Sequence, residues 1–208
     1  MTRQQLIEQI IRNVEGGYQS DDSNITPGLV NLYINQGIAA AVKANYADSL
    51  KIDGVGYVNG SFYTTFKGLD VVADENFLWK IELPETPLGI GRNEGIANLV
   101  FKSSQNEISR NAIPISLSQK GYYDNMRPIP NKVLYYYEGD KIYAKSVVLL
   151  SEYKASVTMI SGGAENDVNS PLNVPMDMIP MVMEYCIKML SVERKQPKDL
   201  ANDGEPIT

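Results

Sequence analysis

Helical apolar spacing occurs at the two ends of this chain, and strand-like composition fills the long stretch between them. Apolar residues recur three and four positions apart from Leu6 to Val14 and again from Leu29 to Val42, a spacing typical of amphipathic helices. A third apolar stripe over residues 176–195 predicts a last helix, with Pro180 in its first turn or so, where a missing N–H is tolerated. The chain therefore cannot be an all-β or an all-α protein.

The starts and ends of the first two helices carry their own signals. Thr2 followed by Gln5 forms a capping-box pattern, and Gly16-Gly17 suits the left-handed conformation that ends a helix. Thr26-Pro27 places a capping hydroxyl before a proline at the first helical position. We therefore expect two antiparallel helices in the first 50 residues.

The middle of the chain, from Lys51 to about Ser170, consists of short runs rich in Tyr, Val, Thr and Phe, separated by Gly, Asn, Asp and Pro. Residues 103–131 have little periodicity, so we expect a long arm there. The strands expected are Gly56–Val58 and Ser61–Phe66 joined by a type I′ turn at Asn59-Gly60, then Phe77–Leu83, Gly95–Lys102, the hairpin of Val133–Tyr137 with Lys141–Lys145, and Val147–Ile160.

Together these patterns predict an α+β fold, in which a helical bundle made from both chain ends carries a large antiparallel β insertion. The expected parts are an N-terminal helical part over residues 1–50, a β domain over 51–170, a C-terminal helix over 171–195 that packs on the N-terminal helices, and an extended tail over 196–208.

Histidine is absent and Cys186 is the single cysteine among 208 residues. Ser-His and Cys-His nucleophile pairs, His-ligated zinc and multi-cysteine clusters are thereby excluded, and so is an internal disulfide. Cys186 lies on the apolar stripe of the last helix, which predicts a buried structural thiol. We expect no catalytic residues, no cofactor and no metal.

Two further motifs have weak chemical meaning. The run from Gly89 to Gly95 contains three glycines, but their spacing does not fit a phosphate-binding loop and a strand pattern follows, so a turn is expected. Any two of the 25 acidic residues could supply the carboxylate pair of a glycoside hydrolase, but nothing in the sequence selects a pair. A small β-rich hydrolase or sugar-binding domain therefore remains an alternative, although an enzyme is not the expected class.

Nineteen Lys and Arg against 25 Asp and Glu give a net charge of −6, which should repel phosphate backbones. No window has the 18 or so uncharged apolar residues of a membrane span, and the opening residues lack the apolar core of a signal peptide. We expect no membrane contact and synthesis in the cytosol.

Thirteen tyrosines, against four Phe and one Trp, are the most informative residues for binding. Successive side chains of a strand point to opposite faces, so three consecutive tyrosines cannot all enter one core. Tyrosine is also enriched at protein interfaces, and the alternative is that these rings simply cover the wet face of a sheet. The candidate subunit-interface residues are Tyr122, Tyr123, Tyr135, Tyr136 and Tyr137, with Pro197, Asp199, Asn202 and Asp203 of the tail.

The chain resembles the head-to-tail adaptor, or neck ring, proteins of tailed bacteriophages, in particular those of crAss-like and related short-tailed phages. The residues that carry the resemblance are the opening TRQQLIEQIIRNV, the second helix TPGLVNLYINQGIAAAVKANY, the segment WKIELPETPLGIGRNEGIANLVF, the hairpin VLYYYEGDKIYAKS and the ending NVPMDMIPMVMEYCIKMLSVERKQPKDLANDGE.

The resemblance implies a virion structural protein that forms a homo-oligomeric ring, commonly dodecameric, in the phage neck below the portal. Such a ring contacts the portal protein and other neck or tail ring proteins, joins head to tail, and lines a channel that passes double-stranded DNA without sequence-specific binding. It is assembled in the host cytoplasm. The alternative within the same class is another tail, tail-tube or cargo structural protein.

Overall fold

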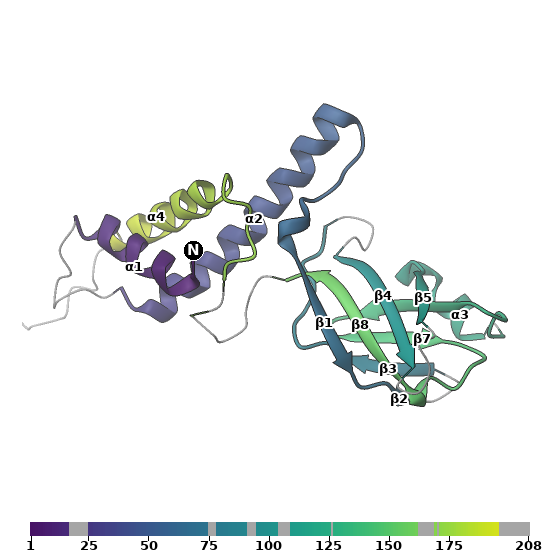
Figure 1. Cartoon of the computed structure of the whole chain (residues 1–208). Helices are drawn as coiled ribbons and strands as arrows, with labels where there is room; N and C mark the ends of the chain where they lie inside the picture. Colours follow the sequence, from purple (N-terminus) through teal and green to yellow (C-terminus); the bar gives the residue numbers. More distant parts are fainter. Residues whose placement is uncertain are drawn as a thin grey trace, which may run out of the picture. The chain divides into compact units, whose positions relative to one another are not determined.

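The computed structural model describes residues 1–16, 25–74, 78–90, 95–103, 109–125, 127–161, 169 and 171–195. The chain divides into two compact units, one that combines Met1–Val42 with Asn166–Thr208 and one that comprises Lys43–Glu165. The first unit is helical and the second is built on a β-sheet (Figure 1). The predicted α+β class, with helices at both chain ends and a sheet inserted between them, is confirmed.

Helix α1 (Arg3–Val14) begins as its sequence predicts. The Thr2 hydroxyl accepts a hydrogen bond from the Gln5 backbone N–H at 3.3 Å, and the Gln5 side chain accepts one from the Thr2 backbone N–H at 3.0 Å. Just past the helix, Gly16 has a φ of 74°, which a residue with a side chain rarely adopts. The predicted Gly17 lies outside the described residues.

Helix α2 (Pro27–Asp53) also begins at its predicted signal, where Thr26 Oγ1 accepts a hydrogen bond from the Leu29 N–H at 3.2 Å. Arg3 of α1 is buried against this helix, and its guanidinium donates to the side-chain oxygens of Asn31 and Asn35 at 2.5 and 2.6 Å. These bonds satisfy a buried charge, which would otherwise be costly, and they set the position of α1 along α2.

Helix α4 (Ile179–Lys195) starts three residues later than the apolar stripe predicts. The preceding residues form a turn, closed by a hydrogen bond from the Met178 N–H to the Pro175 carbonyl. The helix contacts α1, and it approaches α2 closely at Gly37, where an added Cβ would lie 3.0 Å from Val182 Cγ1. A residue without a side chain at position 37 therefore permits the spacing of these two helices.

The sheet of the second unit has eight strands in the order β1-β8-β4-β5-β6-β7-β3-β2 (Figure 1). All neighbouring pairs are antiparallel except β5 and β6, which are parallel, so the predicted antiparallel insertion includes one parallel pair. The strands are β1 (Tyr63–Leu69), β2 (Val72–Ala73), β3 (Leu78–Glu82), β4 (Ile96–Ser103), β5 (Ser109–Pro114), β6 (Val133–Glu138), β7 (Lys141–Lys145) and β8 (Tyr153–Ile160).

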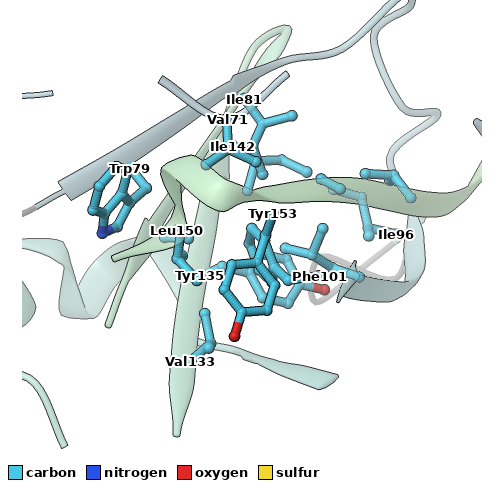
Figure 2. Packing of buried hydrophobic residues seen from close by; sticks show 14 of the residues in the cluster. Val71, Trp79, Ile81, Ile96, Phe101, Val133, Tyr135, Ile142, Leu150 and Tyr153 are labelled. Carbon is cyan, nitrogen blue, oxygen red and sulfur yellow. The ribbon is translucent and has the colours of Figure 1, made fainter. Parts of the chain in front are cut away.

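The main core lies on one face of the sheet, where side chains from nearly every strand meet. Figure 2 shows several of them, including Phe101, Tyr135 and Leu150. Strand β8 contributes every second residue to this core, because successive side chains of a strand point to opposite faces. Tyr153, Ala155, Val157 and Met159 are all buried in the core, whereas Lys154 is exposed.

Two predictions about the strands meet opposite outcomes. The hairpin of β6 and β7 is confirmed, with Glu138 paired to Lys141 and Gly139 at a φ of 65°. The prediction of a hairpin at Asn59-Gly60 is wrong. A type I′ turn needs a positive φ at Asn59, whereas its φ is −56° and its side chain accepts a hydrogen bond from the Ser61 N–H. Asn59 thus caps the 3-10 helix η1 (Gly60–Phe62), and β1 pairs with the distant β8.

The predicted arm over residues 103–131 is also corrected. Its described part contains β5, the 3-10 helix η3 (Leu117–Gln119) and α3 (Lys120–Asn125), and β5 is hydrogen-bonded between β4 and β6 inside the sheet. The sequence SRNAIP gives no signal for this strand because it has no alternating apolar pattern. The strand is held in the sheet by hydrogen bonds of its backbone, which do not depend on such a pattern. The predicted tail, residues 196–208, lies outside the described residues.

The predicted strand over 147–160 divides into two parts. Residues 147–149 precede the 3-10 helix η4 (Leu150–Glu152), and only Tyr153–Ile160 forms a strand. Leu150 is fully buried in the sheet core. The apolar run before β8 therefore packs against the core from a helical turn and not from a strand.

Replacing Gly37 by Val should destabilise the helical unit by about 1–3 kcal/mol, because the new side chain would overlap Val182 and force α2 and α4 apart. Urea unfolding followed by helical circular dichroism measures the change. Gly28→Ala on the same helix is the matched control, since nothing lies within 4 Å of a Cβ built there, and it should leave stability unchanged or raise it. Equal stability of the Gly37→Val variant and the native chain would contradict this packing.

Candidate subunit interface

The three consecutive tyrosines of β6 alternate between the two faces of the sheet, as predicted. Tyr135 is buried in the main core and the partly buried Tyr137 packs against it. Tyr136 points to the opposite face, yet it is buried too. A second layer of the same unit must therefore cover this face.

Helix α3 supplies that layer through Tyr123. The Tyr123 ring meets the Tyr136 ring edge to face at a centroid distance of 5.6 Å, and Tyr136 stacks on Tyr143 at 5.2 Å. The Tyr123 hydroxyl donates to the Leu134 carbonyl at 2.7 Å. These contacts join α3 to β6 and β7 and turn the outer face of the sheet into a small second core.

Two lysines complete the attachment of α3. Lys120 Nζ lies 2.6 Å from a carboxylate oxygen of Glu138 and 5.4 Å from the centre of the Tyr136 ring. The buried Lys145 donates to the Tyr123 carbonyl at 3.0 Å, and its ammonium lies 5.3 Å from that ring. Cations over aromatic faces are attracted by the ring quadrupole, so each lysine adds to the packing of the helix.

Burial alters the acidity of the tyrosines on the main core. It raises the pKa of Tyr135 to about 12 and also raises the pKa of Tyr137. Both hydroxyls are therefore protonated at neutral pH, and a phenol with such a pKa is poorly matched to proton transfer there.

The five candidate interface tyrosines consequently separate into two groups. Tyr123, Tyr135 and Tyr136 are core residues of the subunit itself, so they are removed from the candidate interface. Tyr122 is 76% exposed, and Tyr137 is partly exposed. The other four candidates, Pro197, Asp199, Asn202 and Asp203, lie outside the described residues.

Cys186 lies on the buried side of α4, where burial raises the pKa of its thiol to about 12. A thiol with this pKa is protonated at neutral pH, so it lacks the thiolate that acts as a nucleophile. The described residues bring together no group of three His, Cys, Asp or Glu side chains that could hold a metal ion. None of the described helices is long and apolar enough to cross a membrane.

The glycine-rich run from Gly89 to Gly95 is described only at its two ends. A Cβ on Gly95 would lie 2.6 Å from the Leu88 carbonyl oxygen, so glycine is needed there for a close approach of backbone. Strand β4 follows directly, which agrees with the predicted strand and not with the helix of a phosphate-binding loop.

The structure also shows exposed apolar side chains that the sequence analysis did not select. Four of them, Leu50, Ile52, Val55 and Tyr57, lie at the end of α2 and in the segment that follows it. Val72 of β2 is exposed too, as are Val147 and Leu149 in the segment before η4. Tyr57, Val147 and Leu149 lie within stretches predicted as strands, and only the folded chain shows that their side chains stay outside.

The fold and these side chains define an α+β building block whose aromatic residues serve mainly its own packing. Comparison with known families identifies the class: the family model described as phage tail ring protein 2 matches residues 5–205. The chain therefore belongs to this family of phage tail ring proteins, which are oligomeric structural components of the virion. The search of curated proteins gives no match.

Two adjacent residues of α3 give a direct test of the second core. Tyr123→Ala should cost about 3–5 kcal/mol of unfolding free energy, because it removes a buried ring and the hydrogen bond to Leu134. Tyr122→Ala, the matched control, should change stability by less than about 0.5 kcal/mol. Denaturant unfolding followed by tyrosine fluorescence measures both, and similar small effects of the two variants would refute the role assigned to Tyr123.

Proposed function

We propose that this tail ring protein forms a closed ring in the phage neck below the portal, joins head to tail and lines the channel for the DNA. Membership of the ring family over residues 5–205 is the observation that carries the proposal. The resemblance of the sequence to neck ring proteins supports a position in the neck and a dodecamer. On this view the portal protein and other neck or tail rings are its partners, and the protein catalyses no reaction.

The charge of the chain supports passage of DNA without retention. Each copy has a net charge of −6, so a ring multiplies the negative charge around its channel. Like-charged walls minimise contact with phosphates, and we propose that acidic residues predominate on the channel wall. A structure of the assembled ring whose lumen is dominated by Lys and Arg would contradict this part of the proposal.

The purified protein should assemble into a particle of one fixed mass, about twelve times the 23.1 kDa of the single chain if the ring is dodecameric. Native mass spectrometry gives the mass, and negative-stain electron microscopy shows whether the particle is annular. A closed ring keeps its mass as the protein concentration rises, whereas an open polymer grows. A monomer at all concentrations would contradict the proposal.

We further propose that residues 196–208 contribute to the contact between subunits. A chain that stops after Lys195 should keep its thermal unfolding temperature, because α4 ends at that residue, and should lose the ring mass. Native mass spectrometry compares it with the full chain. An intact ring from the shortened chain would show that the tail is not needed for assembly.

A further inference from the structure

One half of the sheet carries positive charge only, although the chain as a whole is acidic. The neighbouring strands β1, β8, β4 and β5 contain four charged residues, which are Lys67, Lys154, Lys102 and Arg110 (Figure 1). The whole chain has a net charge of −6, so four strands without a carboxylate differ clearly from the average of the chain. A local excess of one sign attracts partners of the opposite sign.

The three lysines lie on one face of the sheet. Lys102 of β4 and Lys154 of β8 are directly opposite each other, so their side chains leave the sheet on the same side. Phe101, the chain neighbour of Lys102, is buried in the main core, which places this pair on the opposite, outer face. Lys67 is exposed and follows Phe66, which packs on the main core, so it also faces outward. We call Lys67, Lys102 and Lys154 the lysine face.

The lysine face is open to solvent in the described part of the subunit. Helix α3 covers the outer face of the sheet at β6 and β7 through Tyr123. All three lysines, in contrast, are exposed, with 55% of the Lys154 side chain accessible. Lys154 pairs with Asp70, but among the described residues no carboxylate pairs with Lys67 or Lys102. Two of the three charges are thus left for a partner to neutralise.

The pairing of Lys102 with Lys154 is unfavourable in the single copy. Like charges directly opposite each other on neighbouring strands repel, and an anion bound between them would remove that repulsion. The same face carries hydrogen-bonding side chains, because Thr158 of β8 is opposite both Thr65 of β1 and Asn98 of β4. Lysines beside hydroxyl and amide groups suit a polar, acidic ligand and not an apolar one.

Residues 196–208 (QPKDLANDGEPIT) are a segment of this chain with the matching charge. They contain one lysine against two aspartates and one glutamate, a net charge of −2. Thirteen residues span up to roughly 45 Å when fully extended, whereas the distance from β4 across β8 to β1 is roughly 10 Å. This C-terminal tail is therefore long enough to continue beyond the end of α4 and still cross the lysine face.

Phosphates of DNA would meet the same lysines, but the chain favours the acidic tail. Each subunit of a ring brings one lysine face and one tail, so a single kind of heterologous contact can join every copy to the next. DNA is disfavoured because a net charge of −6 per copy opposes the close approach of phosphates to the ring.

We propose that the C-terminal tail of one subunit binds to the lysine face of the next subunit, where its carboxylates neutralise Lys67 and Lys102. The inference rests on the ring and on the tail contact proposed above, and it adds the surface that receives the tail. The contact is electrostatic and joins two different surfaces of identical copies.

Reversal of charge on either side tests this contact. The face variant, Lys67→Glu with Lys102→Glu, and the tail variant, Asp203→Lys with Glu205→Lys, should each raise the protein concentration needed for half-assembly by about tenfold or more. Native mass spectrometry over a dilution series measures that concentration. The face variant should unfold at the native temperature or above it, because a carboxylate at position 102 attracts Lys154.

A matched control separates the contact from a general effect of net charge. Lys43→Glu with Lys132→Glu changes two exposed lysines elsewhere and lowers the net charge by as much as the face variant does. This control should assemble like the native chain. A face variant that assembles no worse than the control would overturn the proposed contact.

Mixing the two defective variants tests whether the tail binds the next subunit. In a ring in which they alternate, each native tail meets a native face and each reversed tail meets a reversed face, so every contact regains opposite charges. Rings are therefore expected in the mixture. A mixture that stays unassembled would overturn the contact between subunits. Rings that return only when all four changes are in one chain would show that the tail binds its own subunit.

The remaining outcomes distinguish this contact from the functions proposed above. A face variant that keeps its rings and retains less of a short DNA duplex at low salt would assign the lysine face to phosphates and overturn the tail contact alone. A native chain that forms no ring would instead overturn the proposed function, and the inference with it.

Discussion

The alternation of side chains along β6 imposes a constraint that the rest of the β unit must satisfy. Because Tyr135 enters the main core, Tyr136 must face the other way, and a large ring on that face needs cover. The segment after β5 provides it: α3 places Tyr123 on Tyr136, and Lys120 and Lys145 hold the helix in place. The unit thereby acquires two apolar layers, one on each face of a single sheet.

This arrangement explains why three of the five tyrosines expected at a subunit interface, Tyr123, Tyr135 and Tyr136, are not available to partners. Rings that sequence composition associates with an interface are used in the subunit, whereas shorter aliphatic side chains at the end of α2 and before η4 remain outside. A ring component needs both properties, since each subunit must hold its shape and still meet identical neighbours.

Local patterns predicted the parts of the fold that depend on neighbours in sequence. The capping box and apolar spacing placed α1, the Thr26-Pro27 pair placed the start of α2, and turn residues placed the β6–β7 hairpin. The same reasoning failed at Asn59, where a side chain capped a 3-10 helix, and at β5, a polar strand that pairs with β4 and, in parallel, with β6. Contacts of that kind leave no periodic signal in a polar segment.

The sequence by itself excluded sites built on histidine or on several cysteines, and it determined the division into helical ends and a β middle. Residue counts and apolar periods are properties of the chain alone, so no tertiary structure is needed to read them. Its scaffold patterns also pointed to the phage ring family that the family comparison then showed. Only the tertiary structure decided which tyrosines are core and which apolar residues are surface. Burial depends on what packs against the opposite face of a strand, and for Tyr136 that partner is a helix from another part of the chain.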